Sequence, residues 1–127
     1  MFPLSKTLSE ETDAVAVATT GTSYKVSPSD LDGVPTSSQA FKVSFELVLA
    51  GGGTPTLDAK VQTSWDGSTW HDVATMTQAT AVGDSAEIKD VTVMGRYARS
   101  VVTPGGSGTY TGRVALVSNG HFSAKKA

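Results

Sequence analysis

The sequence contains no cysteine and little charge. The missing thiols exclude disulfides, thiolate zinc sites and cysteine nucleophiles. Charged residues make up 17% of the chain, against about 25% in an average globular protein. Ten Lys and Arg stand against 12 Asp and Glu, for a net charge of -2. Because no basic excess is present to neutralise a phosphate backbone, we predict that the chain does not bind nucleic acid.

Long apolar runs are also missing. The first residues, 1–6, are followed by the acidic pair Glu10 and Glu11, and they lack the apolar stretch of a signal peptide or a membrane span. We therefore expect the chain to be made and kept in the cytosol of the cell that translates it, with no membrane association. The length of 127 residues suits a single domain with one core.

Alternating apolar residues are what the chain does contain. The clearest example is residues 40–49, in which the odd-numbered positions place five apolar side chains on one face: Phe41, Val43, Phe45, Leu47 and Leu49. Residues 57–63 alternate in the same way, and we expect these two strands to be antiparallel. Further strands are expected at 13–19, 70–76, 86–93, 96–103 and 109–117. No segment shows helical periodicity, so the spacing predicts an all-β protein, an antiparallel, jelly-roll-like β-sandwich.

Polar segments without periodicity lie at both ends of the chain. We expect residues 1–12 to form an extended N-terminal arm and residues 118–127 to form a C-terminal tail, on either side of a sandwich of residues 13–117. Residues 27–38 are rich in turn formers and predict a surface loop. The glycine runs at 51–53 and 105–108 predict hairpin loops, because neither is followed by the residues of a phosphate-binding loop.

Residues for catalysis or metal binding are few. A catalytic triad would have to combine His71 with Asp72 or Asp58, and no nucleophile turn accompanies them. Two histidines without cysteine do not complete a structural zinc site, and Asp30 and Asp32 lack the later carboxylates of a calcium loop. We therefore predict a protein that is not an enzyme and needs no metal or cofactor.

The most distinctive string is an Asp66-Gly67 pair between Trp65 and Trp70. Such a pair between strands predicts a tight hairpin with positive φ at both central residues, in which the Asp66 side chain bonds to the following backbone amides. The two tryptophans have two interpretations. Either they stabilise the turn, or an outward-pointing ring offers a flat face to a sugar or a protein partner.

Several strings in residues 57–117 resemble small virion structural proteins of tailed bacteriophages. They are Leu-Asp-Ala-Lys-Val-Gln-Thr-Ser at 57–64, Asp-Gly-x-x-Trp at 66–70, Gly-Arg-Tyr-Ala-Arg at 95–99, and a Thr-Pro-Gly-Gly loop before Thr-Tyr-Thr-Gly at 109–112. The resemblance covers about half of the chain. The Ser-x-Asp-Gly-x-x-Trp segment is also similar to hairpins of discoidin-like and carbohydrate-binding jelly rolls and to the Asp-box hairpin, so it identifies a hairpin more than a function.

Capsid decoration (cement) proteins are commonly small β-domains of this kind. The resemblance implies a homotrimer on the outside of the expanded head that binds the major capsid protein and stabilises the head. It also implies an N-terminal arm that is disordered when free and reaches over neighbouring subunits. Phe2, Pro3 and Leu4 would be the apolar anchors of that arm.

Two other classes of protein fit the same sequence. A tail, neck or baseplate protein would have the same fold in rings of another symmetry. A carbohydrate-binding module would expose Trp65, Trp70 or Tyr97 in a row on one face or at one end of the loops.

Overall fold

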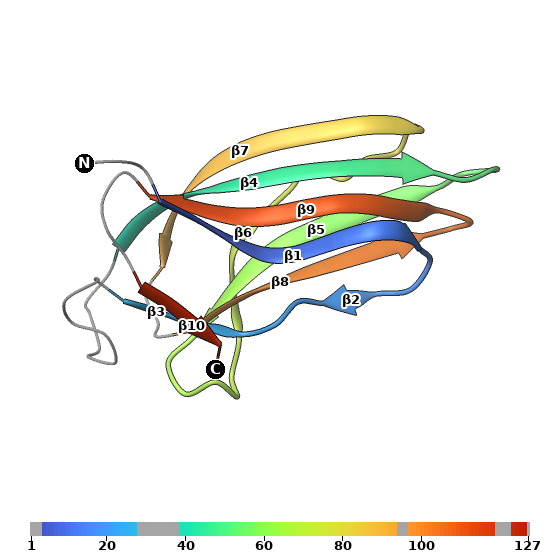
Figure 1. Ribbon diagram of the computed structural model, residues 1–127. Helices are drawn as coiled ribbons and strands as arrows, with labels where there is room; N and C mark the ends of the chain where they lie inside the picture. Colours follow the sequence, from blue (N-terminus) through green and yellow to red (C-terminus); the bar gives the residue numbers. More distant parts are fainter. Residues whose placement is uncertain (1–3, 28–38, 94–96, 119–122, 127) are drawn as a thin grey trace.

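In a computed structural model of the chain, antiparallel strands form two stacked sheets (Figure 1). The structure describes residues 4–27, 39–93, 97–118 and 123–126. Their strands are β1 (Leu4–Val15), β2 (Thr19–Thr20), β3 (Tyr24–Ser27), β4 (Gln39–Ala50), β5 (Thr56–Ser64), β6 (His71–Thr75), β7 (Gly83–Val93), β8 (Tyr97–Gly105), β9 (Thr109–Ser118) and β10 (Ser123–Lys126). Within the described ranges, no helix is long and apolar enough to cross a membrane.

The order of the strands identifies a jelly roll. The first sheet runs β1-β9-β4-β7 and the second runs β10-β3-β8-β5-β6, with β2 paired to β8. Without the short β2 and β10, two four-stranded sheets remain, in which the chain crosses repeatedly from one sheet to the other. Eight strands in two such sheets are the jelly-roll arrangement, so the predicted fold class is confirmed.

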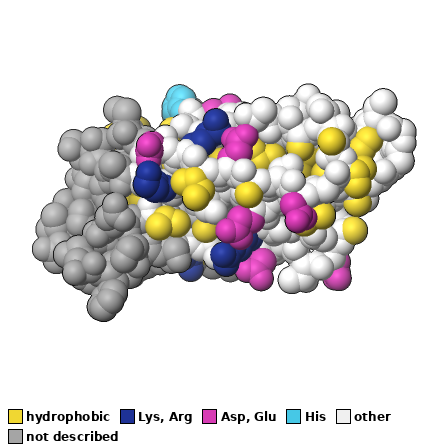
Figure 2. All heavy atoms as spheres, turned by 90° about the horizontal axis from the view of Figure 1, so that it is seen from above, with side chains coloured by type: hydrophobic (Ala, Val, Ile, Leu, Met, Phe, Trp, Pro, Cys, Tyr) yellow, Lys and Arg dark blue, Asp and Glu magenta, His cyan; other side chains and the backbone are white. Residues whose placement is uncertain are grey.

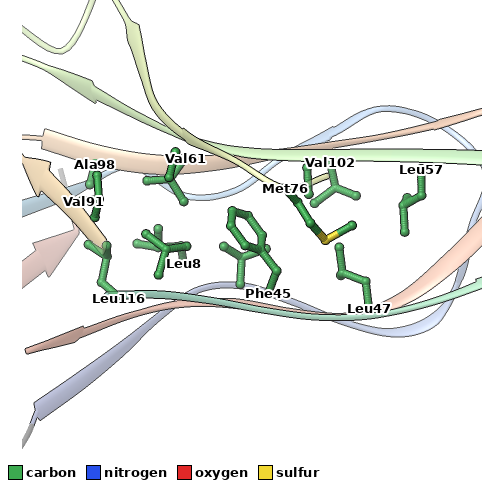
Figure 3. Close-up of a cluster of buried hydrophobic side chains, with 14 of the residues drawn as sticks. Leu8, Phe45, Leu47, Leu57, Val61, Met76, Val91, Ala98, Val102 and Leu116 are labelled. Carbon is green, nitrogen blue, oxygen red and sulfur yellow. The ribbon is translucent and has the colours of Figure 1, made fainter. Parts of the chain in front are cut away.

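The core lies between the two sheets. The alternating apolar residues of β4 and β5 point into it, and Phe45, Leu57 and Val61 are completely buried. Figure 3 shows Phe45, Leu47 and Leu116 on one side of this layer and Val61, Val102 and Leu57 on the other. A strand with one apolar face buries that face only if a second sheet covers it, which explains why two layers form.

Two predicted hairpins are wrong. β4 and β5 follow one another in the chain, yet they lie in opposite sheets, and so do β8 and β9. In the described part of the chain, the loop between β5 and β6 joins two strands that pair with each other as an antiparallel hairpin. The glycine-rich loops instead carry the chain from one sheet to the other, because each strand must turn its apolar face toward the same core.

The predicted terminal arm and tail are largely strands. Most of residues 4–12 pair with β9, from Leu4 opposite Ser118 to Glu11 opposite Gly112, and the Leu8 side chain is buried. A bulge between Thr7 and Ser9 breaks the alternation, which is why the sequence pattern did not indicate a strand.

The other expectations for the ends of the chain also need correction or stay open. Near the C-terminus, β10 pairs with β3, so strands continue on both sides of the expected domain limits at 13 and 117. The expected strand at 13–19 is divided between the end of β1 and the start of β2. Phe2, Pro3 and most of the predicted loop at 27–38 lie outside the described residues.

Candidate functional site

The loop between β5 and β6 is organised by one carboxylate. Asp66 Oδ1 accepts hydrogen bonds from the backbone amides of Ser68 and Thr69, each at 2.8 Å, as the sequence predicted. The buried Ser64 hydroxyl donates to the same oxygen at 3.0 Å and accepts from the Gly67 amide at 2.9 Å. The Thr69 amide, then the Ser68 amide and the Ser64 hydroxyl, lower the pKa of Asp66 from 3.8 to about 2.

The predicted two-residue turn is wrong in its geometry. Gly67 has a positive φ of 80°, but no non-glycine residue in the described ranges does, so Asp66 does not adopt the left-handed conformation. The loop spans residues 65–70 because the carboxylate binds amides two and three residues ahead, which favours a wider turn.

The three aromatic residues near this loop have different surroundings. Trp65 is 50% exposed, whereas Trp70 is half-buried and the guanidinium of Arg99 lies 4.1 Å from the centre of its ring. The ring of Tyr97 lies beside Gly67. The structure therefore brings Trp70 and Tyr97 to the outer face of the second sheet and leaves Trp65 on the exposed loop.

A line of polar contacts crosses this outer face from β8 to β6. Arg99 Nε donates to Gln62 Oε1 at 2.9 Å, and Gln62 Nε2 donates to Asp72 Oδ1 at 2.9 Å. Lys60 Nζ lies 3.4 Å from the Asp72 carboxylate. The hydrogen bond from Gln62 and then the contact with Lys60 lower the pKa of Asp72. Alternation along the strand predicts that Lys60 and Gln62 lie on its polar face. Their contacts with Arg99 and Asp72 were not predictable in the same way, because they depend on which strands pair.

A shallow hollow of about 320 Å³ lies on the same face, beside the Lys60–Asp72 contact. Its lining residues come from three strands and present both apolar and polar atoms: Asp58, Ala59 and Lys60 of β5, Asp72 and Thr75 of β6, Val101 and Thr103 of β8. We call this hollow together with Trp70, Gln62 and Arg99 the β5–β6–β8 face. It offers hydrogen-bond donors and acceptors side by side.

The residues weighed for catalysis do not form a catalytic group in the described ranges. His71 is exposed at the start of β6 and makes no hydrogen bond to Asp72 or Asp58 there. In the part of the chain that the structure describes, no three His, Asp or Glu side chains are grouped so that they could hold a metal ion. Asp30 and Asp32 fall outside it.

The first sheet carries a different kind of surface. On and beside its strands β4 and β7, Val48 is 41%, Val82 61% and Ile88 70% exposed, and Ala86 is exposed between them. In the register, the row of Glu46 and Ala86 lies between the row of Val48 and Asp84 and the row of Ser44 and Ile88. We call Val48, Val82, Ala86 and Ile88 the β4–β7 strip.

One ion pair lies beside the β4–β7 strip and another reaches into it. Lys42 Nζ lies 2.6 Å from Asp90 Oδ1, and Arg113 Nε lies 3.0 Å from Glu46 Oε2. Figure 2, which views the molecule from the β7 side, shows apolar side chains among acidic and basic ones, with no patch of one charge. The strip therefore mixes aliphatic with charged side chains, with Glu46 directly opposite Ala86 and Asp84 directly opposite Val48.

The edge of β7 is less available to a partner than its face. Both carboxylate oxygens of Glu87 accept a hydrogen bond from the Thr77 amide at 3.2 Å, and Lys89 Nζ lies 3.5 Å from Glu87 Oε2. The contact with Thr77 is the main cause that lowers the pKa of Glu87. Charged side chains along an edge strand oppose the addition of a foreign strand.

Comparisons with known proteins give distant structural likenesses. No protein family matches the chain, and no curated protein matches it. One similar chain comes from the structure of the Gx strain of infectious bursal disease virus. Its sequence is 14% identical to this one, the TM-score is 0.49, and the match covers 98% of this chain and 35% of the viral chain. A carbohydrate-binding module (CBM6cm-2) from lichenase 5A of Cellvibrio mixtus, in complex with cellotriose, is 8% identical with a TM-score of 0.42, over 95% of this chain and 100% of that one. The chain thus spans about a third of the viral chain that it matches. The strand pairing and the core of this chain show an all-β protein with a jelly-roll β-sandwich fold.

Proposed function

We propose that the chain is a non-enzymatic structural protein of a phage particle, a capsid decoration protein that binds the major capsid protein on the outside of the head. The observation that carries the proposal is the β4–β7 strip, where aliphatic side chains are exposed on one face among ion-paired residues. Several aliphatic side chains exposed on one sheet face, with polar groups beside them, are typical of protein-binding surfaces. The strings in residues 57–112 that resemble phage virion proteins support the same proposal.

The strip changes the mechanism that the sequence suggested. Attachment through a disordered arm of twelve residues does not fit a chain whose residues 4–12 lie in β1. We place the main contact on the rigid face of β4 and β7 instead, with Phe2 and Pro3 as an additional anchor. A preformed surface loses little conformational entropy on docking, and several copies bound as trimers across neighbouring subunits would strengthen the shell.

Binding to heads tests the proposal. Purified protein would be sedimented with expanded, undecorated heads of the phage whose genome encodes it. We expect saturable binding in a fixed ratio to the major capsid protein. Binding to isolated tails or necks without binding to heads would contradict decoration and favour the tail, neck or baseplate alternative.

A double variant tests the strip itself. Val48→Ser with Ile88→Ser should weaken head binding by more than about tenfold, since each buried aliphatic side chain contributes about 1.5–3 kcal/mol. Val17→Ser is the matched control, because Val17 is 69% exposed and lies outside the strip. Equal binding by the double variant and the control would contradict the role of the strip.

A further inference from the structure

We propose that the β5–β6–β8 face is a second binding site, and that its ligand is a neutral oligosaccharide. This site lies on the sheet opposite the β4–β7 strip, so it is separate from the attachment surface proposed above. Three kinds of observation carry the inference: the layout of the side chains, their hydrogen-bonding capacity and balance of charge, and the aromatic ring at one end.

The layout forms a track along the strands. Three outward positions of β5 pair with three of β8: Asp58 with Thr103, Lys60 with Val101, and Gln62 with Arg99. Outward side chains on one strand are about 6.8 Å apart, so the three rows span about 14 Å. β6 extends the last two rows through Thr75 and Asp72. A track of this length with a hollow of about 320 Å³ has the size of a site for a small ligand.

The polar groups match the hydroxyls of a sugar. A sugar hydroxyl donates and accepts at once, so it fits a surface on which donors and acceptors alternate. Here the ammonium of Lys60 lies 3.4 Å from the carboxylate of Asp72, the carboxylate of Asp58 lines the same hollow, and Gln62 links Asp72 to the guanidinium of Arg99. Two cations and two carboxylates cancel, so a polyanion would meet repulsion from Asp58 and Asp72, whereas an uncharged polyol would not.

The site is held in place before any ligand arrives. The Gln62 side chain accepts a hydrogen bond from Arg99 and donates one to Asp72. These two hydrogen bonds hold the side chains of all three residues in place. Arg99 is also held by the ring of Trp70. Groups that are already ordered lose little entropy on binding, which favours affinity from a shallow site.

Trp70 supplies an apolar surface at one end of the track. It is half-buried beside Arg99, which bonds to Gln62 in the last row, and the loop at 65–70 lies at the same end, where the ring of Tyr97 is beside Gly67. Arg99 covers one face of the Trp70 ring, so the C–H groups of a pyranose would pack on the part of the ring that Arg99 leaves uncovered, with the sugar hydroxyls at the polar groups beside it. A flat apolar ring next to mixed donors and acceptors favours a sugar over a peptide or a metal ion.

Fluorescence of Trp70 in the full chain tests the proposal. Trp65→Phe leaves Trp70 as the single tryptophan reporter, since the chain contains two. Cellotetraose, maltotetraose, mannotetraose and chitotetraose would be titrated, with a heparin tetrasaccharide as the charged probe. We expect a saturable change with at least one neutral probe at millimolar concentration or below. No change with any neutral probe up to about 10 mM, or a change with heparin alone, would overturn the proposal.

A matched pair of lysine variants tests the polar part of the track by calorimetry. Lys60→Ala should weaken binding of the responding sugar by about tenfold or more, because hydrogen bonds to charged groups contribute most. Lys42→Ala is the control, since Lys42 is also exposed and paired with an aspartate, but on the opposite sheet. Equal affinity of the two variants would overturn the assignment of the site. The Val48→Ser, Ile88→Ser protein should keep full sugar affinity, which separates this inference from the proposed head binding.

Discussion

At the scale of single residues, Asp66 determines the shape of its loop and gives it a dependence on pH. Two backbone amides and one hydroxyl point at its carboxylate, and an unfolded chain does not hold them there. The charged form is therefore favoured in the folded protein.

The first prediction concerns acid stability. The pKa of Asp66 in the folded chain is about 2, below its ordinary 3.8, so the unfolded chain takes up the proton first as the pH falls. The stabilisation is complete above pH 3.8 and is lost as the pH falls toward 2. Urea unfolding at a series of pH values should show that Asp66→Asn removes part of this dependence. Asp72 and Glu87, whose pKa values are also lowered, act equally in both proteins, so parallel curves would contradict the role of Asp66.

The second prediction concerns Gly112. Its φ is 137°, and a Cβ atom there would overlap the carbonyl oxygen of Glu46 on the neighbouring strand. Gly112→Ala should lower the free energy of unfolding by about 2 kcal/mol or more, because both the conformation and the space exclude a side chain. Gly52→Ala is the control, since nothing lies within 4 Å and its φ is not positive. Chemical denaturation of both variants makes the measurement, and similar stabilities would contradict the steric explanation.

At the scale of elements, β1 shows how a polar segment becomes part of the sheet. Its pairing with β9 supplies backbone hydrogen bonds along most of its length, and Leu8 anchors it in the core. One buried leucine is too little to produce a periodic signal, which is why the sequence indicated an arm.

The third prediction follows from this anchoring. Leu8 is 2% exposed, so Leu8→Ala should destabilise the fold by about 2–5 kcal/mol through lost burial and the cavity left behind. Glu10→Ala, an exposed position of the same strand, should change stability by less than about 0.5 kcal/mol. Guanidinium unfolding compares the two. A Leu8→Ala protein as stable as the control would show that β1 is not part of the cooperative core.

The strands that alternate over many residues were predictable from the sequence, whereas their partners were not. β4 and β5 repeat an apolar residue at almost every second position, and their buried faces are as predicted. The candidate site depends on pairing: Arg99, Gln62 and Asp72 are far apart in the sequence and meet because β8, β5 and β6 are neighbours. Trp70 was recognised as a candidate, but its partner Arg99 was not.

At the scale of the whole molecule, the topology joins distant parts of the chain. Leu4 lies opposite Ser118, and both sheets contribute to one shared core. Neither sheet buries its apolar face alone, so we expect the sandwich to unfold as one unit.

The fourth prediction is slow, cooperative folding. Sheets made from non-local strand pairs fold in about milliseconds to seconds, because chain entropy is lost before the distant contacts form. Stopped-flow refolding followed by tryptophan fluorescence should give one main phase in this range, with the same rate by far-UV circular dichroism. Folding within microseconds, or different rates from the two probes, would contradict a single cooperative core.

The sequence by itself determined the class of the fold and the faces of the long strands, because alternation along a strand is a local property that needs no partner. It also indicated that Asp66 would bond to the amides just ahead of it, for the same reason. Only the tertiary structure decided that β4 and β5 lie in opposite sheets, that residues 4–12 join the first sheet, and that a tryptophan, an arginine and an aspartate share one face. These features depend on which strands meet, and that is settled by how two apolar faces cover each other across the whole chain.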